Sequence, residues 1–345
     1  MLKYFTGSFA FTAVALVIAA WVGWDTGGTP AAMASTLFIV AVLGVLEVSL
    51  SFDNAVVNAT VLRDMDAVWR HRFITWGIAI AVFGMRVVFP LAIVAVIAQI
   101  SPWDAVVLAG TRPDEYARIL TEAHISVAAF GGSFLAMVGL KHFIDLEREE
   151  YWIYYLERPL ARLGKIEAVE LGIVMLVIYG VSRWLPHADQ LEFIVAGMFG
   201  LLSYIVVDGI SAVLEQDSES TTGAVAVRSG LGSFLYLEVL DASFSFDGVI
   251  GAFALSTNLI VIALGLGIGA MFVRSLTIML VDKGTLTQYR YLEAGAFWAI
   301  LALAAIMFLQ AVLHIPEVVT GLIGAAFIGV AFWQSVQYNR RESGA

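Results

Sequence analysis

Long apolar stretches separated by short polar segments dominate the chain. A window of about 19 residues, the length at which a helix crosses a bilayer, selects ten such stretches. Lys3 before the first stretch and "AAMAS" after it also fit a secretion signal, but we expect an uncleaved helix. The predicted spans are residues 5–24, 35–62, 73–100, 125–143, 168–184, 191–214, 231–255, 259–280, 292–313 and 317–338.

The composition agrees with this pattern. Of the 345 residues, 60% are hydrophobic and 14% are charged, which excludes a soluble globular protein. In lipid only helices and closed barrels satisfy the backbone, and the chain lacks the alternation of barrel strands. We therefore predict an all-α, polytopic transmembrane helical bundle of about ten spans, forming a single integral membrane domain over residues 1–345. The absence of cysteine excludes disulfides and thiolate metal sites, and the net charge of −10 argues against nucleic-acid binding.

Basic residues are distributed unevenly between the two sides of the predicted bundle. With a cytoplasmic N-terminus, 14 of the 19 lysines and arginines lie on the cytoplasmic side. Arg112, Arg118 and Arg183 lie on the opposite side, and Arg86 and Arg274 lie within spans. By the positive-inside rule, this distribution predicts that both termini are cytoplasmic.

Two stretches of the chain repeat each other. Shifted by 194 residues, "LGVLEVSLSFD" (43–53) matches "LEVLDASFSFD" (237–247) at seven of eleven positions, and Glu47 falls on Asp241. The copies lie on the second and seventh spans, an odd number of crossings apart, so they run in opposite directions. Such inverted repeats are typical of secondary transporters, in which matched helices form an ion site near the membrane midplane. The first repeat covers residues 35–143 and the second, inverted repeat covers residues 231–313.

Charged residues occur inside the predicted spans, where each costs about 2.5–3.5 kcal/mol on insertion scales. Arg86 and Arg274 compensate at most two of six acids, which leaves four negative charges. Some carboxylates are therefore protonated, or a cation completes the site. The six acids are Glu47, Asp53, Asp208, Glu238, Asp241 and Asp247.

Helix geometry predicts an interruption in the first copy. Glu47 and Asp53 are six residues apart, about 120° out of phase on a regular helix, so they cannot both face one ion. Unwinding between them is the simplest remedy, and it would also supply carbonyl ligands. Gly248 and Gly251 make the second copy easy to open as well.

The candidate ligands are all oxygen atoms. Oxygen sites suit Mg²⁺, Ca²⁺ or Mn²⁺, whereas Zn²⁺, Cu⁺ and Ni²⁺ usually recruit Cys or His. Asp208, Ser51 and Ser245 are candidate additional ligands, although Asp208 near a span end can reach water and buried serines also link helices. Arg86 and Arg274 are expected to act as counter-ions and gates, because they repel cations.

The motifs "LEVSLSFDNAVV" and "LEVLDASFSFDGVIGAFALS", each followed by a span with a buried arginine, resemble those of the TerC family of bacterial integral membrane proteins, within the LysE-type transporter superfamily. "IGAMFVRSLTIMLVDKGTL" and "YLEAGA" resemble its longer, ten-span branch. The resemblance implies manganese homeostasis, chiefly Mn²⁺ efflux across the bacterial inner membrane, with a label of tellurium resistance. Gly248 departs from the family, where many members carry a serine that could be a ligand. The family's metal positions fall on Glu47, Asp53, Asn54, Glu238, Asp241 and Asp247.

These residues fit three functions. The leading hypothesis is a divalent cation transporter with alternating access, not an enzyme, with Mn²⁺ as substrate, Ca²⁺ or Mg²⁺ as alternatives and no tightly bound cofactor. A non-transporting membrane metal chaperone or scaffold stays open. An intramembrane aspartyl protease is a further alternative, against which Phe52 and Phe246 argue, because its signature places glycine before one aspartate. The expected partners are the metal ion and the lipid bilayer, with a homo-oligomer left open and no nucleic acid.

Overall fold

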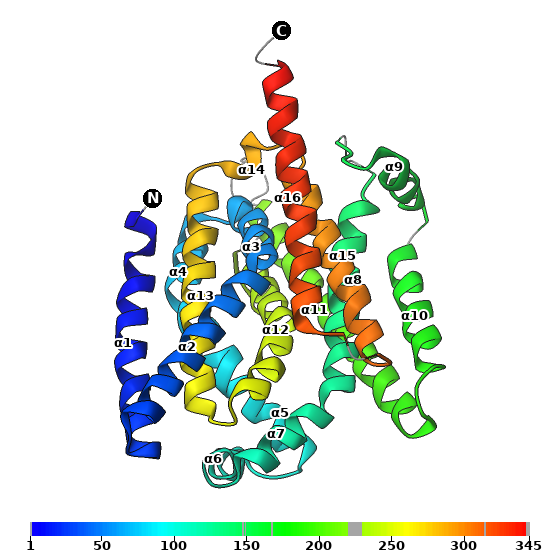
Figure 1. The fold of residues 1–345 in the computed structure, drawn as a ribbon. Coiled ribbons are helices and arrows are strands. Elements are labelled where there is room, and N and C mark those ends of the chain that lie inside the picture. The colour runs from blue at the N-terminus through cyan, green and yellow to red at the C-terminus, as the bar shows by residue number, and fades with distance from the viewer. Residues whose placement is uncertain are drawn as a thin grey trace.

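The computed structural model describes residues 2–146, 148, 150–166, 168–219, 230–313 and 315–342 (Figure 1). Within these ranges, the side chains at positions 78, 211–219, 246, 247, 254, 317, 318 and 342 lie outside the description. Every regular element in this part of the chain is a helix, which confirms the predicted all-α class. The elements are α1 (Leu2–Gly27), α2 (Pro30–Leu50), α3 (Phe52–Asp64), α4 (Ala67–Ala79), the π-helix η1 (Ile80–Val88), α5 (Phe89–Ile97), α6 (Pro102–Thr111), α7 (Pro113–Glu122), α8 (His124–Phe143), α9 (Tyr154–Leu163), α10 (Val169–Ser182), α11 (His187–Glu219), α12 (Gly230–Leu255), α13 (Leu259–Asp282), α14 (Thr285–Gln288), α15 (Leu292–Gln310) and α16 (Glu317–Glu342).

Helices that are long and apolar enough to cross a membrane make up most of the bundle. Eight such helices occur in the described residues, in α1, α2, η1 with α5, α8, α11, α13, α15 and α16. The shorter apolar helix α10 and the helix α12 run beside them (Figure 1), so the predicted spans 168–184 and 231–255 are helical too. The protein is therefore a membrane-embedded, polytopic helical bundle. Helix α1 begins and α16 ends at the same end of it (Figure 1).

The helices differ in how deeply they are buried. Within their apolar windows, α8, α13 and α15 bury 61% of their residues, whereas α1 and α2 bury 22%. Large apolar side chains such as Phe38, Trp76 and Trp333 are exposed on the outside. A water-facing surface rarely carries so much apolar area, so the outer helices suit contact with lipid. Of the three inner helices, α13 carries a buried charge, Arg274.

The two repeats pack against each other reciprocally. Helix α2 of the first repeat lies against α13 of the second, and η1 of the first lies against α12 of the second. The third predicted spans of the two repeats, which form α8 and α15, pack together. Helices α2 and α12 run in opposite directions through the bundle (Figure 1). This is the packing expected of an inverted repeat.

The span predicted over residues 35–62 is broken in two. Helix α2 ends at Leu50 and α3 begins at Phe52, with Ser51 between them at φ −102° and ψ 20°. The Ser51 amide donates to the Glu47 carbonyl at 3.0 Å, and its own carbonyl accepts from the Ala55 amide at 3.2 Å. The backbone thus stays hydrogen-bonded through the break, as a lipid environment requires. The interruption predicted between Glu47 and Asp53 is present.

The second copy behaves differently. Helix α12 is continuous, so the predicted opening at Gly248 and Gly251 is wrong. Gly248 supplies space instead, because a Cβ there would lie 2.9 Å from Glu47 Oε2. The irregular backbone that accompanies the broken helix is η1, a π-helical stretch containing Arg86. Such stretches are rare and occur frequently at functional sites.

Candidate metal centre

A small buried cavity lies where the two repeats meet, at the break between α2 and α3. Its volume is about 30 Å³, and polar side chains from both repeats line it. The lining residues are Ser51, Asn54 and Asn58 of the broken helix, Phe73, Ala81 and Arg86 of α4 and η1, Asp241 of α12, and Ala270, Val273, Arg274 and Thr277 of α13.

Asp241 is the carboxylate that lines this cavity. Asn58 Nδ2 donates to Asp241 Oδ1 at 2.7 Å, and Asn54 lies against the same carboxylate. Asp241 and Asn58 are 7% and 5% exposed. Within the described part of the chain, Oδ1 of Asn54 and Oδ1 of Asn58 have no hydrogen-bond partner. The cavity therefore offers oxygen atoms from both repeats.

Glu47 is held by Arg86 beside the helix break. Arg86 donates to Glu47 Oε1 and to the carbonyl of Ala81, and both charged side chains are buried. Ser51 Oγ donates to the same Glu47 oxygen at 3.2 Å. Gly269 makes this possible, because a Cβ there would lie 2.3 Å from Glu47 Cβ. The charge of Glu47 is thus compensated within the first repeat.

Arg274 is the second buried arginine, and it makes different contacts. It donates to the carbonyl of Phe73, and its guanidinium carbon lies 3.9 Å from the centre of the Phe73 ring. A Cβ at Gly77 would lie 2.2 Å from Arg274 Nη2 and 3.1 Å from Glu238 Oε1, so the two charged groups share the space beside this glycine. Neither oxygen of Glu238 has a hydrogen-bond partner among the described residues. Arg274 therefore balances Glu238 and Asp241 through space.

Asp53 faces another helix. A Cβ at Gly324 of α16 would lie 2.6 Å from Asp53 Oδ2. Asp53 Oδ1 accepts a hydrogen bond from the Asn54 amide at 2.9 Å, and the side chain is buried. Successive helical residues point about 100° apart, so Asn54 faces the cavity while Asp53 faces α16.

The remaining predicted ligands are dispersed. Ser245 is buried on α12. Asp208 is 52% exposed and lies 3.9 Å from Lys141 Nζ. The side chain of Asp247 lies outside the described residues. Among the side chains that are described, no three His, Asp or Glu residues form a group arranged to hold a metal ion. The predicted residues in or beside the cavity are Glu47, Ser51, Asn54, Arg86, Glu238, Asp241 and Arg274.

A second, larger cavity of about 670 Å³ lies at the end of the bundle where α3 ends and α15 begins. Carboxylates outnumber basic groups in its lining, which includes Lys141 and His142. We call this cavity the acidic vestibule. It lies at the same end as the start of α1 and the end of α16 (Figure 1). Its acidic residues are Asp64, Asp145, Glu170, Asp208 and Glu293.

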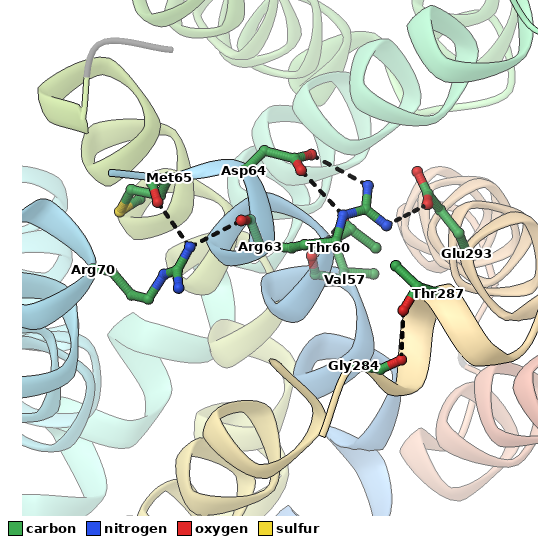
Figure 2. A network of polar contacts seen from close by, with 9 residues as sticks. All are labelled: Val57, Thr60, Arg63, Asp64, Met65, Arg70, Gly284, Thr287 and Glu293. Atoms are coloured by element: carbon green, nitrogen blue, oxygen red, sulfur yellow. Dashed lines mark hydrogen bonds and ion pairs between the residues drawn. The ribbon is translucent and has the colours of Figure 1, made fainter. Parts of the chain in front are cut away.

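Figure 2 shows the polar network beside the vestibule. Arg63 bridges Asp64 and Glu293, with contacts of 3.0 Å from Nε to Asp64 Oδ1 and 3.1 Å from Nη1 to Glu293 Oε2. Arg70 Nη2 donates to the carbonyls of Arg63 and Met65, both at 2.9 Å. The last carbonyls of a helix have no intrahelical partner, so Arg70 caps α3. The network ties the broken helix to α4 and α15.

Comparison with known proteins places the chain in a family. The family described as "Protein of unknown function (DUF475)" matches residues 52–342, most of the chain. The chain belongs to the DUF475 family. The match includes Asn54, Asn58 and Asp241 and begins after Glu47. No curated protein and no solved structure matches the chain.

Asn58 and the vestibule acids other than Asp208 are absent from the residues predicted as ligands of this DUF475 site. Asn58 shares a helix face with Ser51 and Asn54, at spacings of seven and four, so the helical period could have identified it. The vestibule acids come from distant parts of the chain. Asp64 and Glu293, for example, are brought together by Arg63, and no local pattern links them.

Proposed function

We propose that this DUF475 protein is a secondary transporter of divalent metal cations whose main substrate is Mn²⁺. The observation that carries the proposal is the buried cavity at the break between α2 and α3. There, Asp241 from the second repeat meets Asn54 and Asn58 from the first. Secondary transporters place their ion sites at discontinuous helices between inverted repeats, because unwound backbone and side chains from both halves can then reach the ion.

The chemistry of the cavity supports a hard cation as substrate. Its charged ligand is a carboxylate, and the neighbouring groups are two amides and the hydroxyls of Ser51 and Thr277. Mg²⁺, Ca²⁺ and Mn²⁺ prefer such oxygen atoms. The choice of Mn²⁺ and of efflux rests on the resemblance of the repeated motif to the TerC family.

The arginines suit the roles of counter-ion and gate. Arg86 compensates Glu47, and Arg274 balances Glu238 and Asp241, so three buried carboxylates face two guanidinium groups. A divalent cation that enters the cavity adds charge beside both arginines. In the proposed cycle the guanidinium groups move away from the ion, and the two repeats rock to expose the cavity to the other side.

The acidic vestibule supports entry from one end of the bundle. Five carboxylates line the vestibule, and Arg63 and Lys141 supply two positive charges beside them, so the remaining negative charge raises the local concentration of cations. The distribution of lysine and arginine predicts that this end, where α1 starts and α16 ends, is cytoplasmic. Entry from the cytoplasm through the vestibule matches export across the bacterial inner membrane.

The proposal is tested by flux. Purified protein is reconstituted in liposomes, and transport of Mn²⁺, Ca²⁺, Mg²⁺ and Zn²⁺ is measured for the wild type and for Asp241→Asn. Asp25→Asn, an exposed acid of α1 far from the cavity in sequence, is the matched control. We expect Mn²⁺ flux that Asp241→Asn abolishes and Asp25→Asn preserves. Metal binding without flux in the wild type would instead indicate a metal chaperone, and flux unaffected by Asp241→Asn would contradict the proposed site.

A further inference from the structure

Asn58 occupies a central place in the cavity. It lies on α3, which belongs to the first repeat, and its side chain is 5% exposed. Among the described residues, the Asn58 side chain forms one hydrogen bond. It donates to Asp241, which lies 183 residues away in the second repeat. Asn58 thus links the two halves that must move relative to each other in the proposed transport cycle.

The bond to Asp241 orients the Asn58 amide. The contact of 2.7 Å lies within the range of N–H···O hydrogen bonds. Because the amide nitrogen faces the carboxylate, the Oδ1 atom is directed elsewhere. That oxygen is buried, and it has no hydrogen-bond partner among the residues that the structure describes. An unsatisfied acceptor in such a place is costly unless a ligand or water meets it.

The neighbouring groups show what ligand fits. Asn54 Oδ1 is likewise buried without a partner in the described part of the chain, and it lines the same cavity. Thr277 Oγ1 donates to the Val273 carbonyl at 3.0 Å, so its lone pairs remain available. Arg86 and Arg274 also line the cavity, and the Nε atoms of both are buried without a partner in the described part of the chain. When these guanidinium groups move aside, as in the proposed cycle, Asp241, Asn54, Asn58 and Thr277 leave a set of oxygen acceptors, which a hard cation prefers.

The size of the cavity restricts that cation. A volume of about 30 Å³ holds roughly two water molecules, since each needs about 10–15 Å³ of such space. With Arg86 and Arg274 in the positions that they take here, a fully hydrated divalent ion does not fit. Mg²⁺ gives up its water reluctantly and demands a strict octahedral geometry, whereas larger divalent ions accept irregular oxygen sites more readily.

We infer that Asn58 is a metal ligand that also positions Asp241, and that the cavity it lines selects largely dehydrated divalent cations over Mg²⁺. This inference rests on the proposed function and names the ligand and the selectivity of the same site. The amide oxygen binds the ion, while the amide nitrogen keeps the carboxylate aimed into the cavity.

Binding of Mn²⁺ to the purified full-length protein in detergent, measured by isothermal titration calorimetry, tests this inference. Asn58→Ala removes both the oxygen and the donor, and we expect the Mn²⁺ affinity to fall about 10- to 100-fold, as for other groups that bind or orient ligands. Asn58→Asp keeps an oxygen at the same place and is expected to retain binding within about tenfold of the wild type. Ser133→Ala is the matched control. Ser133 is fully buried in α8 and donates to the Ala129 carbonyl of its own helix.

The outcomes separate this inference from the proposed function. Mn²⁺ transport by the wild type, with equal Mn²⁺ affinity in Asn58→Ala, would overturn the ligand role alone. Mg²⁺ binding as tight as Mn²⁺ binding would overturn the selectivity. Absence of binding and transport of all four cations in the wild type would overturn both proposals. If Asn58→Ala does not elute as folded protein, Asn58→Asp decides: retained binding supports the ligand role, and lost binding overturns it.

Discussion

The two copies of the repeated motif hold their acidic residues in different ways. Glu47 is bonded to Arg86 of its own repeat, whereas the equivalent Asp241 is bonded to the neutral amide of Asn58 in the other repeat. The first copy is broken at Ser51, and the second is a continuous helix. Glu47 is paired directly with a guanidinium, whereas Asp241 is bonded to a neutral amide and is balanced by Arg274 only through space, so its oxygen atoms stay open to a cation. Glu47 and Asp241, although equivalent in the repeat, therefore have different roles.

The largest effects are expected when the two equivalent acids are neutralised. Asp241→Asn removes the charged ligand but leaves a side chain of the same shape beside Asn58, so we expect Mn²⁺ flux to fall at least about 100-fold while the protein stays folded. Glu47→Gln leaves Arg86 buried without its counter-ion and is expected to cost about 3–5 kcal/mol of stability. Liposome flux and thermal unfolding in detergent measure the two effects. Equal stability losses in Asp241→Asn and Glu47→Gln would contradict the conclusion that the two acids have different roles.

Neutralising both members of each buried charge pair sharpens the comparison of the two arginines. Arg86→Gln is expected to destabilise the protein by about 3–5 kcal/mol, and the double variant Glu47→Gln with Arg86→Gln should recover most of that loss. Arg274 is bonded to a carbonyl, so Glu238→Gln with Arg274→Gln should show a weaker coupling, below about 1 kcal/mol. Double-mutant cycles of thermal stability measure both couplings. A larger coupling energy for Glu238 and Arg274 than for Glu47 and Arg86 would contradict this difference between the two arginines.

A smaller effect is expected from the glycine that makes room for Glu47. Gly269→Ala places a Cβ 2.3 Å from Glu47 Cβ and 3.0 Å from the Gly44 carbonyl, so α2 and α13 must move apart. Such overpacking costs about 1–3 kcal/mol. Gly172→Ala is the control, because a Cβ there meets nothing within 4 Å. We expect a lower unfolding temperature for Gly269→Ala only, and similar temperatures for both variants would show that the contact is not tight.

The smallest effect is expected in the acidic vestibule. Neutralising Glu170 and Asp208 together, as Glu170→Gln and Asp208→Asn, weakens the attraction of cations without touching the buried cavity or the Arg63 network. Because exposed charges are screened beyond about 10 Å at 0.1 M salt, we expect Mn²⁺ flux to fall severalfold at low ionic strength and to approach the wild-type rate at high ionic strength. Flux assays across a salt series measure this, and a loss independent of salt would point to a structural role.

Much of the fold follows from the sequence. Apolar segments about 20 residues long predict membrane helices because a polar backbone in lipid must bond to itself, and the described spans are helical. The break near Ser51 is predicted because Glu47 and Asp53 cannot face one ion from a regular helix; the break is present, but Asp53 lies against Gly324 of α16. The repeated motif also predicts which residues carry buried charge. These properties depend on residues close together in the chain, so they can be predicted from local sequence patterns.

The partners of those charges depend on tertiary structure. Glu47 and Asp241 align in the sequence, yet packing gives one an arginine and the other an asparagine. The same glycine pattern that suggested an open helix at Gly248 instead makes room for a carboxylate from α2. Asp53 is directed to α16 and Asp208 to the vestibule, although both occur in predicted spans. The sequence by itself determined a membrane helical bundle with repeated buried acids. Only the tertiary structure decided which acid is bonded to an arginine and which to an amide, because that choice depends on distances between helices far apart in the chain.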